Sequence, residues 1–296
     1  MTDAYCIGET MALVAPQPPA RLHHGGPAHL DVAGAESNVA IGLAQLGVRV
    51  AWRGRVGADP LGRLVLDRIA AAGVDIGGAE TDPDHPTGVL FKDPAPDGTA
   101  VHYLRRGSAG ARLHRGMLPP AARLVHLTGV TPALSPAARD LVRHTLADRP
   151  VRGALVSFDV NHRPALWSGP DEAATVLAEL ADRADVVFVG LDEANRLWGC
   201  TDPAQVRAVL PGAGAVVVKD GAVGATEGDT FVPTVPVPVL EPVGAGDAFA
   251  AGYLAALLRG ADVPARLRLG HRVAAAVLGT TGDTVQLPAD LQEARP

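Results

Sequence analysis

Six short and almost uninterrupted apolar runs constrain the fold more than any other feature of the sequence. They lie at residues 4–7, 50–53, 124–127, 154–159, 186–189 and 215–218. Runs of this length without polar alternation are typical of strands that are buried on both faces. Longer segments with helical spacing of apolar residues lie between and after them, at 39–46, 61–72, 136–146, 172–181, 192–198, 245–258 and 264–278. Strands that alternate with helices predict an α/β fold with a mainly parallel sheet.

Two stretches interrupt this alternation. Residues 10–33 and 85–108 are rich in proline and glycine and contain short alternating patterns, such as those at 88–92 and 100–104. We expect the two stretches to pair into a small second sheet at the edge of the main one, where such a sheet commonly serves as a lid. The sequence has no flexible linker, charge block or internal repeat, so we expect a single domain over 1–296 that includes this lid.

Composition excludes several classes of protein. The 26 Lys and Arg residues against 32 Asp and Glu give a net charge of −6, so no overall positive field attracts nucleic acid or an anionic membrane. No apolar run approaches the roughly 20 residues that a membrane span needs. Cys6 and Cys200 form no CxxC pair, which fits a protein of the reducing cytoplasm. Neither Lys92 nor Lys219 is followed by Ser or Thr, which excludes a Walker-type P-loop.

The strongest chemical signal is the string Glu-Pro-Val-Gly-Ala-Gly-Asp-Ala-Phe at 241–249. It leads from a Pro-rich segment into the helix expected at 245–258. The amides of Gly244, Ala245 and Gly246 would point from the start of that helix toward a bound anion, with Asp247 beside them in the first turn. The same residues could also do no more than form a turn and complement the helix dipole.

This string resembles the C-terminal signature of the ribokinase-like, or PfkB-type, carbohydrate kinases. The N-terminal half is similar to the first signature of that family, in Gly-Ala-Glu-Ser-Asn-Val-Ala at 34–40 and Gly-Arg-Val-Gly-Ala-Asp-Pro-Leu-Gly at 54–62. The resemblance implies a ribokinase-like three-layer fold with a small β lid. It also implies a kinase that uses ATP together with Mg²⁺.

The resemblance assigns roles to individual residues. Asp247 is the expected general base for the substrate hydroxyl, and the amides of Gly244, Ala245 and Gly246 are expected to stabilise the transferring phosphoryl group. The residues expected at the nucleotide are Asn161, Arg163, Lys219, Gly221, Gly224, Gly244 and Gly246, with His271 and Ala275 at the border of the adenine. Glu193 matches the glutamate of the family's Asn-x-x-Glu string and is the expected Mg²⁺ ligand, although Gly190 replaces the asparagine.

Within the family, the sequence is most similar to the kinases that phosphorylate the sugar acid 2-keto-3-deoxygluconate at its 6-hydroxyl. Four strings, at 8–11, 34–38, 103–109 and 159–167, show this similarity. It implies that the substrate is bound by Gly34, Asn38, Tyr103, Arg105, Arg163, Asp247 and Asp283. Arg105 is the first choice for the carboxylate of the sugar acid, because a guanidinium can meet a carboxylate in bidentate geometry.

Several alternatives stay open on the sequence alone. Asn38 could cap a helix, Tyr103 could be a core residue, and Arg105 and Arg106 would point to opposite faces of a strand. Glu241-Pro242 stands where the family usually has Asp-Thr. Because proline has no amide to donate, a contact made there by a threonine hydroxyl or amide is lost, which leaves a monovalent-cation site at this loop an open question. The rival functions are a kinase of fructose or another neutral sugar, and a non-catalytic sugar-binding regulator. A homo-oligomer formed through the lid is a further expectation.

Overall fold

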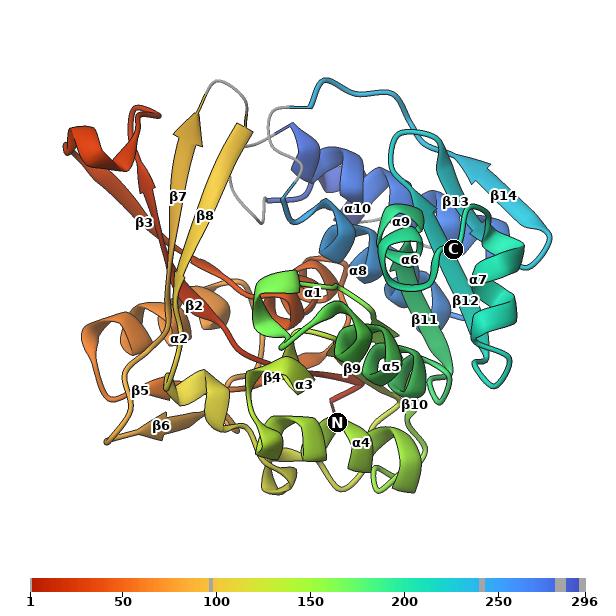
Figure 1. Cartoon of the computed structure of the whole chain (residues 1–296), viewed down its shortest axis with the longest axis horizontal. Helices are drawn as coiled ribbons and strands as arrows, with labels where there is room; N and C mark the ends of the chain where they lie inside the picture. Colours follow the sequence, from red (N-terminus) through yellow and green to blue (C-terminus); the bar gives the residue numbers. More distant parts are fainter. Residues whose placement is uncertain (1, 96–97, 240–242, 280–285, 293–296) are drawn as a thin grey trace.

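An eight-stranded sheet forms the centre of the molecule (Figure 1). The computed structural model describes residues 2–95, 98–239, 243–279 and 286–292. The strand order of this central sheet is β14-β13-β12-β11-β10-β9-β1-β4. All pairs from β12 to β4 are parallel, and the hairpin of β13 and β14 adds two antiparallel pairs at one edge. The predicted α/β class with a mainly parallel sheet is therefore confirmed.

The six predicted apolar runs form the strands of this sheet that pair in parallel. The central strands are β1 (Ala4–Ile7), β4 (Val50–Arg53), β9 (Leu124–Thr128), β10 (Leu155–Asp159), β11 (Val186–Gly190), β12 (Ala215–Asp220), β13 (Gly224–Glu227) and β14 (Thr230–Pro233). Ala4 is paired with Val50 on one side and Leu124 on the other. The hairpin of β13 and β14 was not predicted, because its short strands contain Gly, Thr and Pro and no apolar run.

Helices cover both faces of the central sheet and complete the three layers (Figure 1). One face is covered by α1 (Ala35–Gln45), α2 (Pro60–Ala71), α8 (Ala245–Leu258) and α9 (Val263–Leu278). The other is covered by α4 (Pro136–Asp148), α5 (Pro170–Ala181), α6 (Leu191–Trp198) and α7 (Pro203–Val209). The short helices are α3 (Thr131–Leu134) and α10 (Ala289–Gln292). On the α8 face, the buried ring of Phe188 meets the rings of Phe249 and Tyr253 edge to face.

Local signals explain where the helices begin and end. Asp59 precedes α2, and its side chain accepts a hydrogen bond from the amide of Gly62 at 2.7 Å. Gly47 and Gly73 follow α1 and α2 with φ values of 79° and 86°, a conformation in which glycine ends a helix at low cost. α1 begins earlier than the predicted 39–46, because its first turn is built from small and polar residues that give no apolar pattern.

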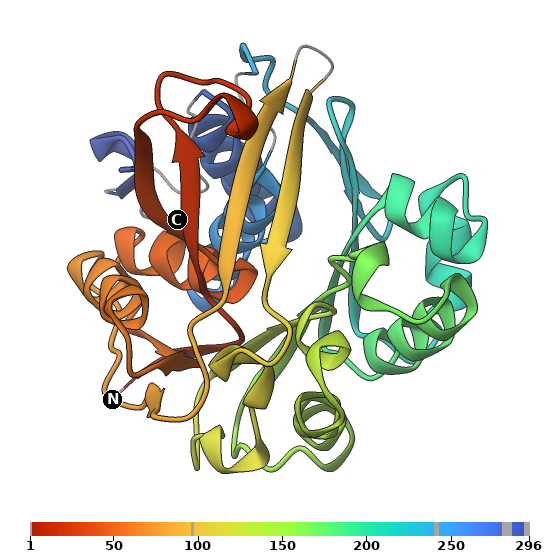
Figure 2. The same cartoon turned by 60° about the vertical axis from the view of Figure 1, so that its left-hand side comes forward.

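A second sheet, which we call the lid sheet, contains β2 (Met11–Pro16), β3 (Ala28–Ala33), β7 (Val89–Ala95) and β8 (Gly98–Leu104) in the order β3-β2-β7-β8. Its strands come from the two stretches that interrupt the βα alternation, which join through a parallel pairing of β2 with β7. It projects away from the central sheet in both views (Figures 1 and 2). The short strands β5 (Arg55–Gly57) and β6 (Glu80–Asp82) pair beneath it as a third, two-stranded sheet. They were not predicted, because each strand is only three residues long.

Within the described ranges, no helix combines the length and the apolar character that crossing a membrane requires. Cys6 and Cys200 are both buried, and neither forms a disulfide.

Candidate functional site

A pocket of about 930 Å³ lies between the lid sheet and the carboxyl ends of the central strands. Ligands of open α/β sheets commonly bind at this end of the strands. The candidates that line it are Gly34, Asn38, Tyr103, Arg105, Asn161, Arg163, Glu193, Lys219, Gly221, Gly224, Gly244, Ala245, Gly246, Asp247, His271 and Ala275. Asp283 and the pair Glu241-Pro242 lie outside the described residues. The fold thus brings candidates from both halves of the chain to one place.

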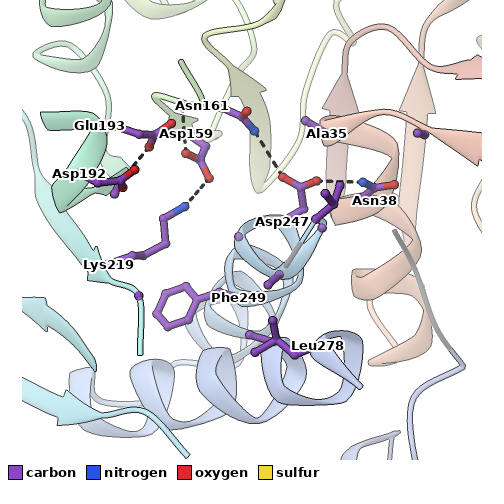
Figure 3. Close-up of a pocket in the computed structure, with 18 of the residues that line it drawn as sticks. Ala35, Asn38, Asp159, Asn161, Asp192, Glu193, Lys219, Asp247, Phe249 and Leu278 are labelled. Atoms are coloured by element: carbon purple, nitrogen blue, oxygen red, sulfur yellow. Dashed lines mark hydrogen bonds and ion pairs between the residues drawn. The ribbon is translucent and has the colours of Figure 1, made fainter. Parts of the chain in front are cut away.

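Asp247 lies in the first turn of α8, where two asparagine side chains approach it (Figure 3). Its Oδ2 accepts a hydrogen bond from Nδ2 of Asn38 at 2.9 Å, and its Oδ1 accepts one from Nδ2 of Asn161 at 3.4 Å. Burial raises the pKa of Asp247 to about 7, and the Asp159 carboxylate acts in the same direction. The Asn38 amide and the charges of Arg163 and Lys219 oppose this rise. The carboxyl group can therefore exchange a proton near neutral pH.

The start of α8 faces the pocket beside Asp247. Gly244 precedes the helix with a φ of 84°, a left-handed conformation that suits glycine. The amides of Ala245 and Gly246 belong to the first turn, where amides have no carbonyl partner within the helix. The first turn of a helix therefore offers donors and a partial positive charge to an anion at this point.

Lys219, near the end of β12, forms an ion pair with Asp159, at the end of β10. Its Nζ lies 2.9 Å from Oδ2 of Asp159 and 5.9 Å from the centre of the Phe188 ring. Burial alone would lower the pKa of Lys219, but the carboxylates of Asp159, Glu193 and Asp247 raise it. The ammonium group therefore stays charged, and it lines the pocket on the side opposite the lid sheet.

Glu193 lies in the first turn of α6 and accepts two backbone hydrogen bonds. Its Oε1 accepts from the amide of His162, and its Oε2 from the amide of Gly190, both at 2.9 Å. Burial raises the pKa of Glu193. Each oxygen accepts one backbone hydrogen bond and keeps a second acceptor site, so the role of Glu193 as an Mg²⁺ ligand stays a prediction. Across the part of the chain that the structure describes, no three His, Cys, Asp or Glu side chains are grouped as a metal site.

Arg105 reaches the pocket just after β8 and is held by Glu9. Its Nε donates to Oε2 of Glu9 at 2.8 Å, and its Nη2 contacts the same oxygen. Ser108 donates its hydroxyl to Oε1 of Glu9 at 2.7 Å. The Arg105 guanidinium lies over the Tyr103 ring, 5.3 Å from its centre. The orientation of this guanidinium is therefore set inside the protein, by a buried carboxylate.

The structure decides between the alternatives that the sequence left open. Asn38 does not cap α1, because Gly34 precedes that helix and the Asn38 amide faces Asp247. Tyr103 is 38% exposed and is no core residue. Arg106 is exposed, whereas Arg105 faces the pocket. Arg163 lines the pocket and is also exposed, with its Nη1 donating to its neighbour's carbonyl at 3.3 Å.

Several residues that shape the pocket were not among the predicted site residues. Glu9, Lys92 and Leu90 line the lid end, and residues 234–239 after β14 contribute to the far end. No local pattern in the sequence pairs Arg105 with Glu9. In the fold, Gly110 leaves room for Glu9, because a Cβ atom at Gly110 would lie 2.4 Å from Cγ of Glu9.

The chain is similar to known proteins over nearly its whole length. The model of the family described as pfkB family carbohydrate kinase matches residues 1–290. The chain is 35% identical over 303 residues to a 2-dehydro-3-deoxygluconokinase of Bacillus subtilis (strain 168), covering 97% of this chain and 92% of that protein.

Two solved structures resemble the whole chain. A PfkB protein from Polaromonas sp. JS666 is 38% identical with a TM-score of 0.88, covering 99% of this chain and 100% of that one. A fructokinase from Vibrio cholerae O395, in a form that contains fructose, ADP and a calcium ion, is 25% identical with a TM-score of 0.85 over 98% of both chains.

The site contains the groups that a sugar kinase needs. A carboxyl group that titrates near neutral pH can accept the proton of a hydroxyl, and a helix start together with a buried ammonium can stabilise a phosphoryl group. The family match extends over nearly the whole chain. The chain therefore belongs to the pfkB family of carbohydrate kinases and is a phosphotransferase that acts on a sugar.

Proposed function

We propose that the protein transfers the terminal phosphoryl group of ATP to the 6-hydroxyl of 2-keto-3-deoxygluconate, also called 2-dehydro-3-deoxygluconate. The position of Asp247 is the main support, because it lies at the start of α8 between the Arg105 and Lys219 ends of the pocket. The name of the Bacillus subtilis relative supports the substrate. The ADP in the Vibrio cholerae fructokinase supports a nucleoside phosphate donor.

In the proposed reaction, Asp247 orients the hydroxyl and takes its proton. A bond forms from the hydroxyl oxygen to the γ-phosphorus as the bond from that phosphorus to the bridging oxygen breaks, and ADP leaves. The amides of Gly244, Ala245 and Gly246 stabilise the negative charge on the transferring group. The proton passes from Asp247 to solvent when the products leave.

The remaining candidates surround the nucleotide in this proposal. Lys219 and Arg163 neutralise phosphate charge, Asn161 lies beside the transferring group, and Gly221 and Gly224 leave room for the nucleotide next to β12. When bound with ATP, Mg²⁺ would also neutralise phosphate charge. Glu193, which lines the pocket, is the residue that would hold the metal, and we assign no step to it.

The lid sheet completes the proposal. It covers the substrate end of a single domain over 1–296 and excludes water from the reacting groups. Side chains of Leu30, Tyr103 and Leu104 on this sheet are 46%, 38% and 67% exposed, which supports assembly of a homo-oligomer through the lid. Sedimentation of the purified protein measures that assembly directly. The two free buried cysteines support a cytoplasmic location.

A coupled assay of ADP release across a panel of sugars and sugar acids tests the function. We expect kcat/KM for 2-keto-3-deoxygluconate to exceed that for fructose, because Arg105 lines the lid end of the pocket. A preference for fructose would support the neutral-sugar kinase instead. If none of the compounds in the panel causes ADP release, the result would support the non-catalytic sugar-binding protein.

A further inference from the structure

The carboxylate of Asp247 is held on both of its oxygens by side chains from distant parts of the chain. Asn38 comes from α1 and Asn161 from the loop after β10, and each is only 6% exposed. Figure 3 shows their amides approaching Asp247 from opposite sides. The sequence resemblance had assigned Asn38 to the substrate and Asn161 to the nucleotide, but neither assignment explains why both amides face this one carboxylate.

The orientation of both amides follows from charge. An ionised carboxylate only accepts hydrogen bonds, so the NH₂ group of each asparagine has to face it. The Oδ1 atoms of Asn38 and Asn161 are then left buried with no hydrogen-bond partner among the described residues. Both side chains therefore direct their donors, and not their acceptors, at Asp247.

The backbone of Asn161 supports the same conclusion. Its φ is 38°, and within the described ranges the other non-glycine residue with positive φ is Arg149. Such a conformation persists only where the surrounding structure enforces it. Here the amide of Asn161 donates to Oδ1 of Asp159 at 3.3 Å, and the next amide, that of His162, donates to Glu193. The loop therefore holds the Asn161 side chain toward Asp247.

The other donor is held by helix packing. Gly42, one turn after Asn38 on α1, lies so close to α8 that a Cβ atom there would be 2.6 Å from Cβ of Ala251. This close approach of the two helices places the Asn38 amide next to Asp247. Both donors are thus attached to rigid parts of the fold.

We propose that Asn38 and Asn161 are positioning residues that form an amide clamp on Asp247, holding its two oxygens and stabilising the ionised form that accepts the substrate proton. The clamp supplies donors that a partly buried carboxylate would otherwise lack. Its importance for catalysis rests on the proposed role of Asp247. Its effect on the proton affinity of Asp247 can be measured without any substrate.

The charged groups around Asp247 come from several elements and would remain in the clamp variants. Asp159 at the end of β10 raises the pKa of Asp247, whereas Arg163 and Lys219 lower it. On α1, Glu36 faces Thr128 and Thr131 instead. On the lid side, Arg105 is paired with Glu9. A change of midpoint in an asparagine variant therefore reports the lost donor.

The test is a titration of Asp247 in the ligand-free full-length protein by ¹³C NMR of its carboxyl carbon, with the signal assigned by its loss in Asp247→Asn. A charge-assisted hydrogen bond of ordinary strength corresponds to about one to two pH units. We expect Asn38→Ala to raise the midpoint by about one unit or more. We expect a smaller rise in Asn161→Ala, because that contact is longer. The control Asn195→Ala, which removes a hydrogen bond to the carbonyl of Cys200, leaves the midpoint unchanged.

Two further readouts separate a clamp from a substrate contact. In Asn38→Ala, the pH at which kcat/KM is half-maximal should move to a higher value, in parallel with the NMR midpoint of Asp247. Asn38→Leu removes the donor at similar side-chain volume and adds no charge, so it should raise the midpoint as Asn38→Ala does, and it serves as the test if Asn38→Ala does not fold. An unchanged or lower midpoint in the folded Asn38 variants overturns the clamp, even if KM for the sugar rises. Absence of kinase activity would refute the proposed function and leave this titration valid.

Discussion

At the scale of single residues, Asp247 has to meet two conflicting requirements. Burial next to the helix start allows it to contact the reacting groups, but the same burial raises its pKa to about 7 and disfavours the ionised form. The folded protein therefore binds this proton more tightly than the unfolded chain does. The contribution of Asp247 to stability falls as pH rises from about 4, the usual aspartate value, to the folded pKa near neutrality.

This conflict leads to a prediction for Asp247→Asn. We expect kcat to fall by roughly 10²–10⁴-fold or more, because the general base is lost, while sugar and ATP still bind. We also expect Tm at about pH 8 to equal or exceed that of the wild type, because no buried charge remains. Asp171→Asn, in the first turn of α5 and exposed, is the matched control and should keep normal activity. A near-normal kcat in Asp247→Asn would remove this residue from the mechanism.

The same pKa predicts the pH dependence of the wild-type enzyme. Only the ionised carboxylate accepts a proton, so kcat/KM for the sugar should rise with pH through a midpoint of about 7, the pKa of Asp247 in the free protein. The measurement is kcat/KM over roughly pH 5 to 9 with ATP saturating. If the midpoint of the kcat/KM profile lies near the ordinary aspartate pKa, the prediction is wrong, and the Asp247 carboxyl group is better hydrated than its burial indicates.

Arg105 determines the preference for an acid in our proposal. Arg105→Ala would leave the buried Glu9 without its partner, so the comparison is made in two backgrounds, Glu9 and Glu9→Gln. We expect kcat/KM for 2-keto-3-deoxygluconate to fall by about 10–150-fold, the range of a charge-assisted hydrogen bond, and that for fructose to fall much less. Arg105→Lys should also be impaired, because it lacks the guanidinium fork. Equal losses for both sugars would make Arg105 a structural residue.

At the scale of secondary-structure elements, the lid sheet joins two segments that are far apart in sequence. β2 and β3 come from residues 10–33, and β7 and β8 from residues 85–108. The apolar side chains of Met11, Leu13, Ala33 and Leu90 form a small cluster on this sheet, separate from the two large cores. A sheet with so small a core is expected to open more readily than the central sheet.

We therefore predict that sugar binding reduces hydrogen exchange in both lid segments together. Amide exchange of 10–33 and 85–108 is compared with and without saturating substrate, with β9 and β10 as internal references. The central strands should change little, because they are already buried. Unchanged exchange in both lid segments would show that they do not close on the substrate.

At the scale of the whole molecule, the position of the site depends on how α8 packs against the central sheet. Phe188 on β11 is fully buried and contacts both Phe249 and Tyr253 of α8. It also lies under the Lys219 ammonium. The contacts that stabilise the fold are therefore continuous with those that place the start of α8 at the pocket.

Phe188→Ala should destabilise the protein strongly. We expect the free energy of unfolding to fall by about 3–5 kcal/mol, the usual cost of removing a buried phenylalanine. The measurement is urea unfolding followed by circular dichroism. Phe231→Ala is the control, because that ring is 53% exposed and should cost much less. Similar losses for both variants would show that α8 is not held through this aromatic contact.

The sequence by itself determined the features that depend on short-range pattern. Apolar runs identified the parallel strands of the central sheet, because a strand buried on both faces has no polar alternation. Helical spacing located α8 at 245–258, in agreement with the structure, and the glycines before Asp247 marked its start. The two Pro- and Gly-rich stretches indicated the lid sheet. The family resemblance then named many of the polar and glycine residues of the pocket, because each signature is a local string.

Only the tertiary structure decided which of these residues face one another. Asn38 and Asp247 are 209 positions apart, and Glu9 and Arg105 are 96 apart, so no local pattern pairs them. The raised pKa of Asp247 likewise arises from burial by several elements and from the Asp159 carboxylate on β10. Hydrogen bonds and desolvation depend on distances between atoms, and packing brings those atoms together irrespective of their order in the chain. Local strings in the sequence thus identify the site residues, whereas the partners and the protonation of these residues are properties of the folded molecule.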